Sequence, residues 1–302
     1  MTISCELPMS KNQSSVTLNS IFSKTETTST LSHTPVESHG LNSMPSFSGL
    51  TDLIQRKIQS KTVVLLVGLP GSGKSTVCNQ LAEFLNSQGY SSLIYNAGNI
   101  RRAMSSGFSD SEFFNPDNVD ATKKRELYAT MCMDNMLDDL RENRVNVGFL
   151  DATNSTKARR RSMLELIQNA DFEIPNIFVL DISCNDARLS NYNITSKAFN
   201  QDYRGKDIAT SISDFKRRSE HYYRVFEPLL PQEFCEFKNV KQLSICDGGK
   251  TFVAPCEDSA DKDDVSKLLA AFVTNYYKLY GERYHAAVEE FYNFAFGAGT
   301  GL

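Results

Sequence analysis

Runs of apolar residues alternate along most of the chain with stretches whose apolar positions recur at helical spacing. Five runs have the length and composition of strands: Val63–Val67, Ser91–Ala97, Val145–Leu150, Asn176–Ser183 and Lys241–Cys246. Helical patterns lie between them, near residues 74–88, 122–142, 156–169, 185–196 and 207–223. Strands that are apolar along their whole length and separated by helices are typical of a parallel sheet covered on both faces. The pattern therefore predicts an α/β fold with a doubly wound, mainly parallel sheet.

The two ends of the chain depart from this pattern. Residues 1–50 contain 12 Ser and 7 Thr and only isolated apolar residues, too few to offset the entropy of ordering. We expect a disordered tail there, which is either a target for protein kinases, since Thr34 precedes a proline, or a plain linker. From about residue 261 to 296 aromatic residues recur at helical spacing, which favours packing over a cofactor site. We therefore divide the chain into a tail (1–50), an α/β domain (51–250) and a helical extension packed on that domain (251–302).

Charge and composition exclude several classes of protein. The chain carries 32 Lys and Arg against 36 Asp and Glu, a formal net charge of −4. General nucleic-acid binders usually contain a strongly basic domain, so we expect no nucleic-acid partner. No apolar run approaches the ~18 residues that span a bilayer, and residues 1–15 lack a secretion signal, so we expect no membrane partner. Seven cysteines without a C-x-x-C pair and four histidines indicate a reduced, cytoplasmic protein without a zinc site.

Residues 68–76 read GLPGSGKST, which fits the pattern G-x-x-x-x-G-K-[ST] directly after an apolar strand. Glycines in such a loop let successive backbone N–H groups point at phosphates, at the positive end of the following helix. Lys74 is expected to reach the β- and γ-phosphates and the Ser75 hydroxyl to ligate Mg²⁺. The strand–loop–helix context disfavours the alternative of a glycine-rich turn without a ligand. We therefore predict a P-loop NTPase-type site for ATP and Mg²⁺, formed by Gly68, Gly71, Ser72, Gly73, Lys74, Ser75 and Thr76.

A second candidate for nucleotide chemistry is Asp151, which ends the apolar run VNVGFLD. The carboxyl end of such a strand lies beside the phosphate loop, where a carboxylate can hold Mg²⁺ directly or through water. A strand-end Asp is often only a turn former or a helix cap. The phosphate loop about 80 residues upstream favours the metal-binding role. We therefore predict Mg²⁺ ligation by Ser75 and Asp151.

Twelve of the 32 basic residues gather in four short clusters, at residues 101–102, 123–125, 157–161 and 216–218. Most such clusters are solvated helix faces, and several of these residues must be that. Arg101, however, follows the second predicted strand, where a doubly wound sheet presents its binding crevice. The planar guanidinium matches phosphate oxygens in a bidentate way. The clusters therefore indicate an anionic acceptor for the phosphoryl group.

Five segments occur in an order that resembles one known family. They are the phosphate loop, NAGNIRR (96–102), FFNPDN (113–118), DATNSTKARR (151–160) and SCND (183–186). Together they resemble the kinase domain of 6-phosphofructo-2-kinase, over about residues 60–250. That family makes fructose 2,6-bisphosphate from fructose 6-phosphate and ATP, so the resemblance implies this reaction and a P-loop NTPase-type fold.

The resemblance also implies roles for residues at matching motif positions. The matching positions imply catalytic roles for Lys74, Asp151 and Lys197. Before Lys197, this sequence is one residue shorter than the family pattern. Whether Asp151 is also a general base stays open. Asn193 is implied to contact the nucleotide, and Cys184 to lie at the active site, although the sequence alone describes a buried strand-end thiol. Six residues are implied to bind the sugar phosphate: Arg101, Arg125, Thr153, Arg159, Arg218 and Tyr222.

The expected function is thus ATP-dependent phosphorylation of fructose 6-phosphate at its 2-hydroxyl. No histidine stands in the R-H-G motif of the family's phosphatase domain, and 54 residues follow Gly248, so we expect no phosphatase half. Two alternatives remain: a P-loop kinase for another acceptor, such as a nucleic-acid end or a tRNA, and a non-catalytic sensor of nucleotide or sugar phosphate. A homodimer and regulatory kinases acting on the tail also stay open.

Overall fold

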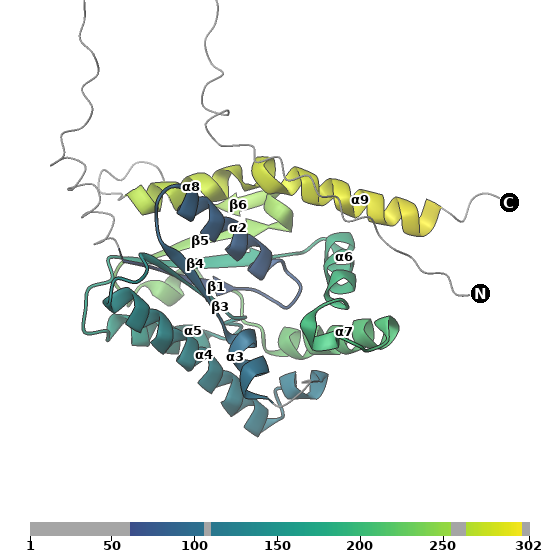
Figure 1. Cartoon of the computed structure of the whole chain (residues 1–302), viewed down its shortest axis with the longest axis horizontal. Coiled ribbons are helices and arrows are strands. Elements are labelled where there is room, and N and C mark those ends of the chain that lie inside the picture. The colour runs from purple at the N-terminus through teal and green to yellow at the C-terminus, as the bar shows by residue number, and fades with distance from the viewer. Residues whose placement is uncertain (1–60, 106–109, 255–263, 298–302) are drawn as a thin grey trace, which may run out of the picture. The chain divides into compact units, whose positions relative to one another are not determined.

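The computed structural model describes residues 61–105, 110–254 and 264–297, all within the compact unit formed by residues 47–302 (Figure 1). The tail expected at residues 1–50, with its expected sites for protein kinases, lies outside the described residues. Among the described helices, none combines the length and the apolar character that crossing a bilayer requires.

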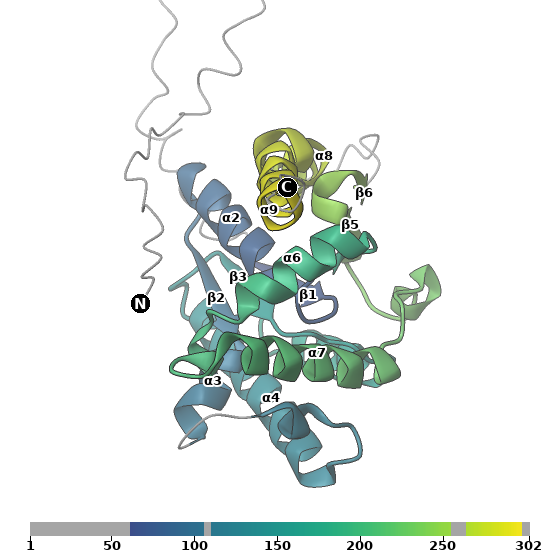
Figure 2. The ribbon, with the colours of Figure 1, turned by 90° about the vertical axis from the view of Figure 1, so that its right-hand side faces the viewer.

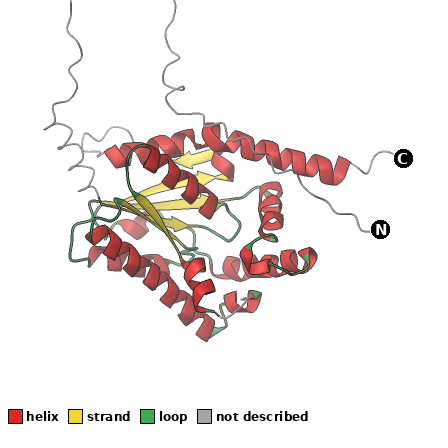
Figure 3. Cartoon of the chain, viewed as in Figure 1, coloured by secondary structure: helices red, strands yellow, loops and turns green. Residues whose placement is uncertain are grey.

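Six strands form one sheet in the order β2-β3-β1-β4-β5-β6. Figure 3 shows the strands in yellow with the helices in red around them. They are β1 (Thr62–Val67), β2 (Ser92–Asn96), β3 (Val147–Asp151), β4 (Asn176–Ser183), β5 (Val240–Cys246) and β6 (Thr251–Val253). All neighbours pair in parallel except β5 and β6, which are antiparallel. The five predicted strands and the mainly parallel sheet are confirmed. The prediction lacked β6, because a strand of three residues is too short to show a pattern, although two of its exposed residues, Phe252 and Val253, are apolar.

Strand β1 shows how the sheet is covered on both faces. All six of its residues are buried, and residues 63–67 alternate between two hydrophobic clusters. Val64 and Leu66 pack toward α2 (Lys74–Ser87) and α8 (Asp264–Tyr276). The alternate positions, such as Leu65, pack toward α4 (Val119–Arg141) and α5 (Lys157–Gln168). Since successive side chains of a strand point to opposite faces, a continuous apolar run requires helices on both, as the doubly wound prediction states.

Three further helices carry residues of the site: α3 (Ala97–Met104), α6 (Ala187–Lys197) and α7 (Ile208–Val225). Helix α3 follows β2 directly, α6 follows β4, and α6 and α7 lie side by side (Figure 2). Side chains cap the first turns, as where Asn96 accepts a hydrogen bond from the Asn99 N–H at 3.0 Å. Helix α3 was not predicted, because only Arg101 among its eight residues is buried and no apolar stripe marks it.

The C-terminal residues form the predicted helical segment, which consists of α8, a π-helical turn (Tyr277–Gly281) and α9 (Glu282–Gly297). Aromatic residues of α8 pack, as expected: the Phe272 ring centroid lies 5.4 Å from that of Phe84 on α2. The expectation fails near the end of α9, where Phe294 is 86% exposed. A Cβ at Gly281 would lie 2.2 Å from the Gly248 carbonyl oxygen. Only glycine therefore permits this segment to approach the end of β5 so closely.

Candidate active site

The phosphate loop joins β1 to α2, and its glycines are required by its geometry. Gly68 has a φ of 143°, and a Cβ there would lie 2.2 Å from the carbonyl oxygen of Ile182 on β4. Gly73 has a φ of 99°, in the left-handed region that favours glycine. Lys74 follows as the first residue of α2, so the loop leads directly into the free N–H groups of a helix N-terminus. This local geometry is suited to an anionic phosphate.

Lys74 and Ser72 add side-chain groups to the loop. Lys74 is only 8% exposed, and its Nζ donates to the Leu69 carbonyl oxygen at 2.6 Å. Burial lowers the pKa of Lys74 to about 8, although the negative charge of Asp151 opposes this shift. The Ser72 Oγ is buried and has no hydrogen-bond partner among the described residues. Lys197, the last residue of α6, lines the adjacent cavity, and burial lowers its pKa as well.

Asp151 ends β3 and lines the same cavity as Ser75. The Asn96 side-chain amide donates to Asp151 Oδ2, which fixes the orientation of the carboxylate. Within the described part of the chain, no group of three or more His, Cys, Asp or Glu could hold a metal ion alone. Mg²⁺ usually binds one or two protein oxygens together with substrate phosphates and water. Ser75 and Asp151 therefore fit a Mg²⁺ ion shared with a nucleotide.

The segment after Asp151 is tied to the phosphate loop. The Gly68 N–H donates to the Thr153 carbonyl oxygen at 3.1 Å, and Asn154 Nδ2 donates to the Leu66 carbonyl oxygen at 2.6 Å. Asn154 has a φ of 45°, a left-handed conformation that asparagine tolerates. The loops that follow β1 and β3 thus form one hydrogen-bonded unit.

A cavity of about 360 Å³ opens beside this unit, which is within the range of ligand pockets. Seven basic and three acidic side chains line it, although the whole chain is net negative. All six residues predicted to bind the sugar phosphate line it: Arg101, Arg125, Thr153, Arg159, Arg218 and Tyr222. So do several of the predicted nucleotide and catalytic residues: Gly71, Gly73, Lys74, Ser75, Asp151 and Lys197. Predicted nucleotide and acceptor residues therefore share one cavity.

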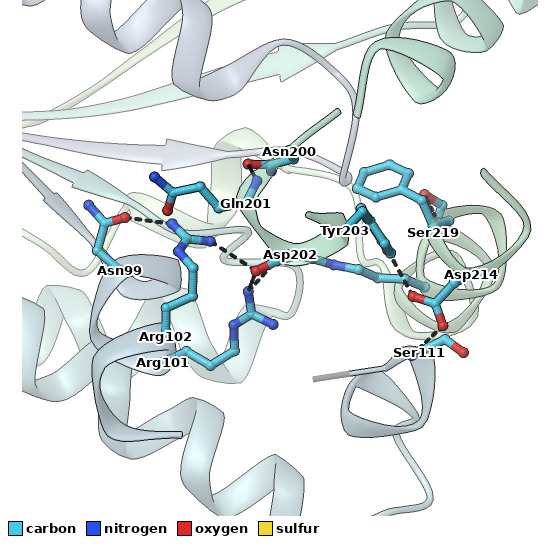
Figure 4. A network of polar contacts seen from close by, with 12 residues as sticks. Asn99, Arg101, Arg102, Ser111, Asn200, Gln201, Asp202, Tyr203, Asp214 and Ser219 are labelled. Atoms are coloured by element: carbon cyan, nitrogen blue, oxygen red, sulfur yellow. Dashed lines mark hydrogen bonds and ion pairs between the residues drawn. The ribbon is translucent and has the colours of Figure 1, made fainter. Parts of the chain in front are cut away.

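A buried carboxylate, Asp202, organises one wall of the cavity (Figure 4). Arg101 Nη2 lies 2.6 Å from both of its oxygens, and Arg102 and Arg218 approach it to 3.4 and 3.2 Å. Burial alone would raise the pKa of Asp202, but the Arg101 hydrogen bond and the charges of the three arginines lower it. The ionised Asp202 thus holds three guanidinium groups together against their mutual repulsion.

Arg101 and Arg218 keep hydrogen-bonding capacity beyond Asp202. Nε and Nη1 of Arg101 and Nε of Arg218 are buried, without partners among the residues that the structure describes. Both guanidinium groups also face the Phe114 ring, with their central carbons 5.2 and 3.9 Å from its centroid. Buried donors without acceptors are costly. This wall therefore fits an anionic group that supplies acceptor oxygens.

Arg125, Arg159 and Tyr222 add to the wall from α4, α5 and α7. Arg125 donates to the Phe113 carbonyl oxygen and Arg159 pairs with Glu126. The Arg159 side chain is 10% exposed and that of Glu126 is 52% exposed, so solvent reaches this pair from the glutamate side. Each arginine is thus held in place by a neighbour while its side chain borders the cavity.

Five predicted residues lie outside the cavity lining: Gly68, Ser72, Thr76, Asn193 and Cys184. The first three belong to the loop and its helix, and Asn193 Nδ2 donates to the Gly71 carbonyl oxygen at 2.8 Å. The Cys184 Sγ instead lies 3.7 Å from the Asp186 carbonyl oxygen. Burial raises the pKa of Cys184 to about 12, so the thiol stays protonated at neutral pH. The structure separates Cys184 from the cavity, and its catalytic role stays a prediction based on resemblance.

Three consecutive arginines on α5 have three different environments. Arg159 lines the cavity, whereas Arg160 is fully buried and its Nη2 lies 2.8 Å from Glu233 Oε2. Arg161 is 54% exposed and pairs with two surface glutamates. Successive residues of a helix are rotated by about 100°, which explains the divergence. Only the first of the three borders the cavity.

Sequence reasoning missed Asp202, Asn96 and Phe114 as parts of the site. Asn96 could have been recognised, since an Asn between a strand and a basic segment is a helix-cap signal. No local pattern marks Asp202, which lies 101 residues from Arg101 in the sequence. Phe114 likewise matters only through the guanidinium groups that fold against it.

The chain was compared with known proteins. The sequence profile of the family described as 6-phosphofructo-2-kinase matches residues 50–255. The relative 6-phosphofructo-2-kinase 1 of Saccharomyces cerevisiae is 38% identical over 65% of this chain and 23% of its own length. The 6-phosphofructo-2-kinase/fructose-2,6-bisphosphatase 3 of Homo sapiens is 30% identical over 64% of this chain and 36% of its own length.

Among solved structures, Kti12 of Chaetomium thermophilum in complex with ADP-AlF3 matches 69% of this chain and 94% of its own. Its TM-score is 0.42 at 13% identity. The chain spans between 23% and 45% of the length of the curated relatives it matches. The family profile covers more than half of the chain. The chain therefore belongs to the 6-phosphofructo-2-kinase family.

Proposed function

We propose that the protein transfers the γ-phosphoryl group of ATP to the 2-hydroxyl of fructose 6-phosphate, giving fructose 2,6-bisphosphate and ADP. The observation that carries this proposal is one cavity with a phosphate loop on one wall and five arginines on the other. Family membership and the names of the relatives support a sugar phosphate as the acceptor. They favour it over the nucleic-acid end that was considered from the sequence.

For the nucleotide, we assign the β- and γ-phosphates to the loop N–H groups and to Lys74. Lys74 would exchange its bond to the Leu69 carbonyl for phosphate oxygens. Ser75 and Asp151 would hold Mg²⁺, which when bound neutralises charge on the phosphoryl oxygens. Asn96 keeps the Asp151 carboxylate oriented for this task.

For the acceptor, we assign the 6-phosphate to the arginine wall, where buried donors of Arg101 and Arg218 lack partners in the described chain. The 2-hydroxyl oxygen forms the new bond to the γ-phosphorus as the bond to the β–γ bridging oxygen breaks, and the hydroxyl proton is released. Positioning and charge neutralisation supply most of the catalysis of phosphoryl transfer. Lys74 and Lys197 contribute positive charge beside the transferred group.

The test is turnover of MgATP by the purified protein with a panel of sugar phosphates, with the product identified by NMR. Consumption of fructose 6-phosphate with phosphate appearing on C2 is the expected result. Turnover only with an RNA or DNA end would contradict the proposal and support the alternative, a P-loop kinase that acts on nucleic-acid ends. Binding of ATP and fructose 6-phosphate without any turnover would show a sensor and contradict the proposal.

A further inference from the structure

Helix α6 carries two residues of the proposed nucleotide site, yet it has little hydrophobic anchoring of its own. Asn193 and Lys197 lie on it, and Leu189 is its only buried residue. It packs instead against two other helices, α7 and α9, and Figure 1 shows α9 passing across one end of α6. The Tyr192 ring centroid lies 5.4 Å from that of Phe291 on α9. The position of α6 therefore depends on the C-terminal helix as well as on α7.

The start of α6 is held by the end of β5. Asp247 Oδ1 accepts hydrogen bonds from the backbone N–H groups of Asn185 and Asp186, at 2.6 and 3.0 Å. The Asp247 carbonyl oxygen in turn lies 2.9 Å from Nε2 of His285 on α9. Strand β5, α6 and α9 are thus joined at one point.

Tyr284 connects α9 to the phosphate loop through two hydrogen bonds. Its hydroxyl donates to Asn193 Oδ1 at 3.1 Å, and Asn193 Nδ2 donates to the Gly71 carbonyl oxygen at 2.8 Å. Burial raises the pKa of Tyr284, so the hydroxyl stays protonated and remains a donor. The ring is seated against Gly248, where a Cβ would lie 2.7 Å from Tyr284 Cδ1. The position of the Tyr284 ring therefore requires glycine at position 248, since any side chain there would displace the ring.

The hydrogen bond to the Gly71 carbonyl affects how the phosphate loop arranges its N–H groups. A trans peptide points its C=O and its N–H in opposite directions. Holding the Gly71 carbonyl toward α6 therefore also sets the direction of the Ser72 N–H, which donates to the Leu69 carbonyl oxygen at 3.2 Å within the loop. The hydrogen bond from Asn193 thus helps to fix the shape of the loop, and the N–H groups of such loops bind the nucleotide.

We propose that Tyr284 is a positioning residue for nucleotide binding, acting through Asn193 on the Gly71 carbonyl of the phosphate loop. Tyr284 lies outside residues 50–255, the part of the chain that the family profile matches. The C-terminal helix is then part of the nucleotide site and more than a cover for the sheet. This rests on the proposed function only in that the loop binds the phosphates of a nucleotide.

The experiment compares wild type with Tyr284→Phe, which keeps the ring and removes only the hydroxyl. Titration calorimetry with MgADP is expected to show a dissociation constant raised about three- to tenfold, the effect of one neutral hydrogen bond. The KM for ATP should rise equally, whereas the KM for the sugar phosphate and the thermal midpoint should stay unchanged. A control is Tyr292→Phe, which removes a hydroxyl bond from α9 to the Arg188 carbonyl oxygen. This control should bind ADP like wild type.

The coupling to Asn193 is tested by a double variant. Asn193→Ala is expected to weaken ADP binding at least as much as Tyr284→Phe, and the double variant should match Asn193→Ala within about twofold. Wild-type affinity in Tyr284→Phe, or additive losses in the double variant, would overturn the relay. Since ADP binding needs no acceptor, wild-type protein that binds ADP but leaves fructose 6-phosphate unchanged would contradict the proposed function alone.

Discussion

The two walls of the cavity are built in opposite ways. The nucleotide wall is a contiguous loop, residues 68–76, whose shape comes from backbone conformation and from hydrogen bonds to neighbouring loops. The acceptor wall gathers five arginines from four helices, among them Arg101 on α3 and Arg218 on α7. The first wall offers mainly fixed backbone dipoles, and the second offers full charges that carboxylates keep in place. Variants of the two walls should therefore change different kinetic constants.

The largest effect is expected for Asp151→Ala, at the junction of the two walls. Without this carboxylate the proposed Mg²⁺ site loses its only charged protein ligand, so kcat should fall about 10³-fold or more. Steady-state kinetics with saturating substrates measures this. Asn96→Ala, which removes the side chain that orients Asp151, should cost about 10–100-fold. Near-normal turnover in Asp151→Ala would show that the nucleotide wall works without it.

Arg101→Ala tests the acceptor wall. Its guanidinium is 4% exposed, pairs with Asp202 and has further buried donors without partners in the described chain. Loss of charged hydrogen bonds to the sugar phosphate should raise the KM for that substrate about 10–100-fold. The KM for ATP should change little, because the Arg101 side chain contacts Asp202 and Phe114 and makes no hydrogen bond to the described residues of the phosphate loop. An unchanged KM for the sugar phosphate would show that Arg101 is not part of the acceptor site. It would also contradict the assignment of different substrates to the two walls.

The contrast between the walls also explains what could be predicted from the sequence. The phosphate loop was recognisable because its chemistry lies in consecutive residues. The arginines could be named from the family resemblance, but Asp202, which holds them, could not. Its importance arises only when α3, α7 and the turn at Gln201–Tyr203 meet in space. A sequence pattern shows periodicity and local motifs, but it does not show which distant residues come into contact in the fold.

The fold shows the same division. Long apolar strands such as β4 were predicted because continuous burial imposes continuous apolar sequence. Strand β6 and helix α3 were not, because each is short and leaves most side chains partly or fully exposed. The dependence of α6 on α9 was hidden for a related reason. Tyr284 and Asn193 lie 91 residues apart, and the aromatic stripe indicated packing without indicating the partner.

The nucleotide wall should respond to pH through Lys74. Burial lowers the pKa of Lys74 to about 8, so the ammonium loses its charge above that pH in the free protein. The kcat/KM for ATP should then fall above pH about 8, approaching tenfold per pH unit, since this constant reports groups of the free enzyme. The kcat at saturating ATP should persist to higher pH, because bound phosphate favours the charged form.

Above pH 8, stability should change with pH in the opposite direction to activity. A lysine with a lowered pKa in the folded state disfavours folding while it is charged, so the free energy of unfolding should rise between pH 8 and 10.5. Lys74→Met should remove this part of the rise, and the comparison with wild type isolates it from other groups. A kcat/KM for ATP that stays level to pH 9.5 would separate the charge of Lys74 from nucleotide binding.

The smallest effect is expected for Arg161→Ala, two residues beyond Arg159 on the same helix. Arg161 is 54% exposed and its partners Glu165 and Glu236 are half exposed as well. Exposed ion pairs contribute about 0–1 kcal/mol, so the thermal midpoint should hardly change and both KM values should stay within about twofold of wild type. Arg159→Ala is the matched positive control, since it removes an arginine from the cavity and should raise the KM for the sugar phosphate. If both variants raised that KM equally, the acceptor wall would act through overall positive charge, and the specific placement of each guanidinium would not matter.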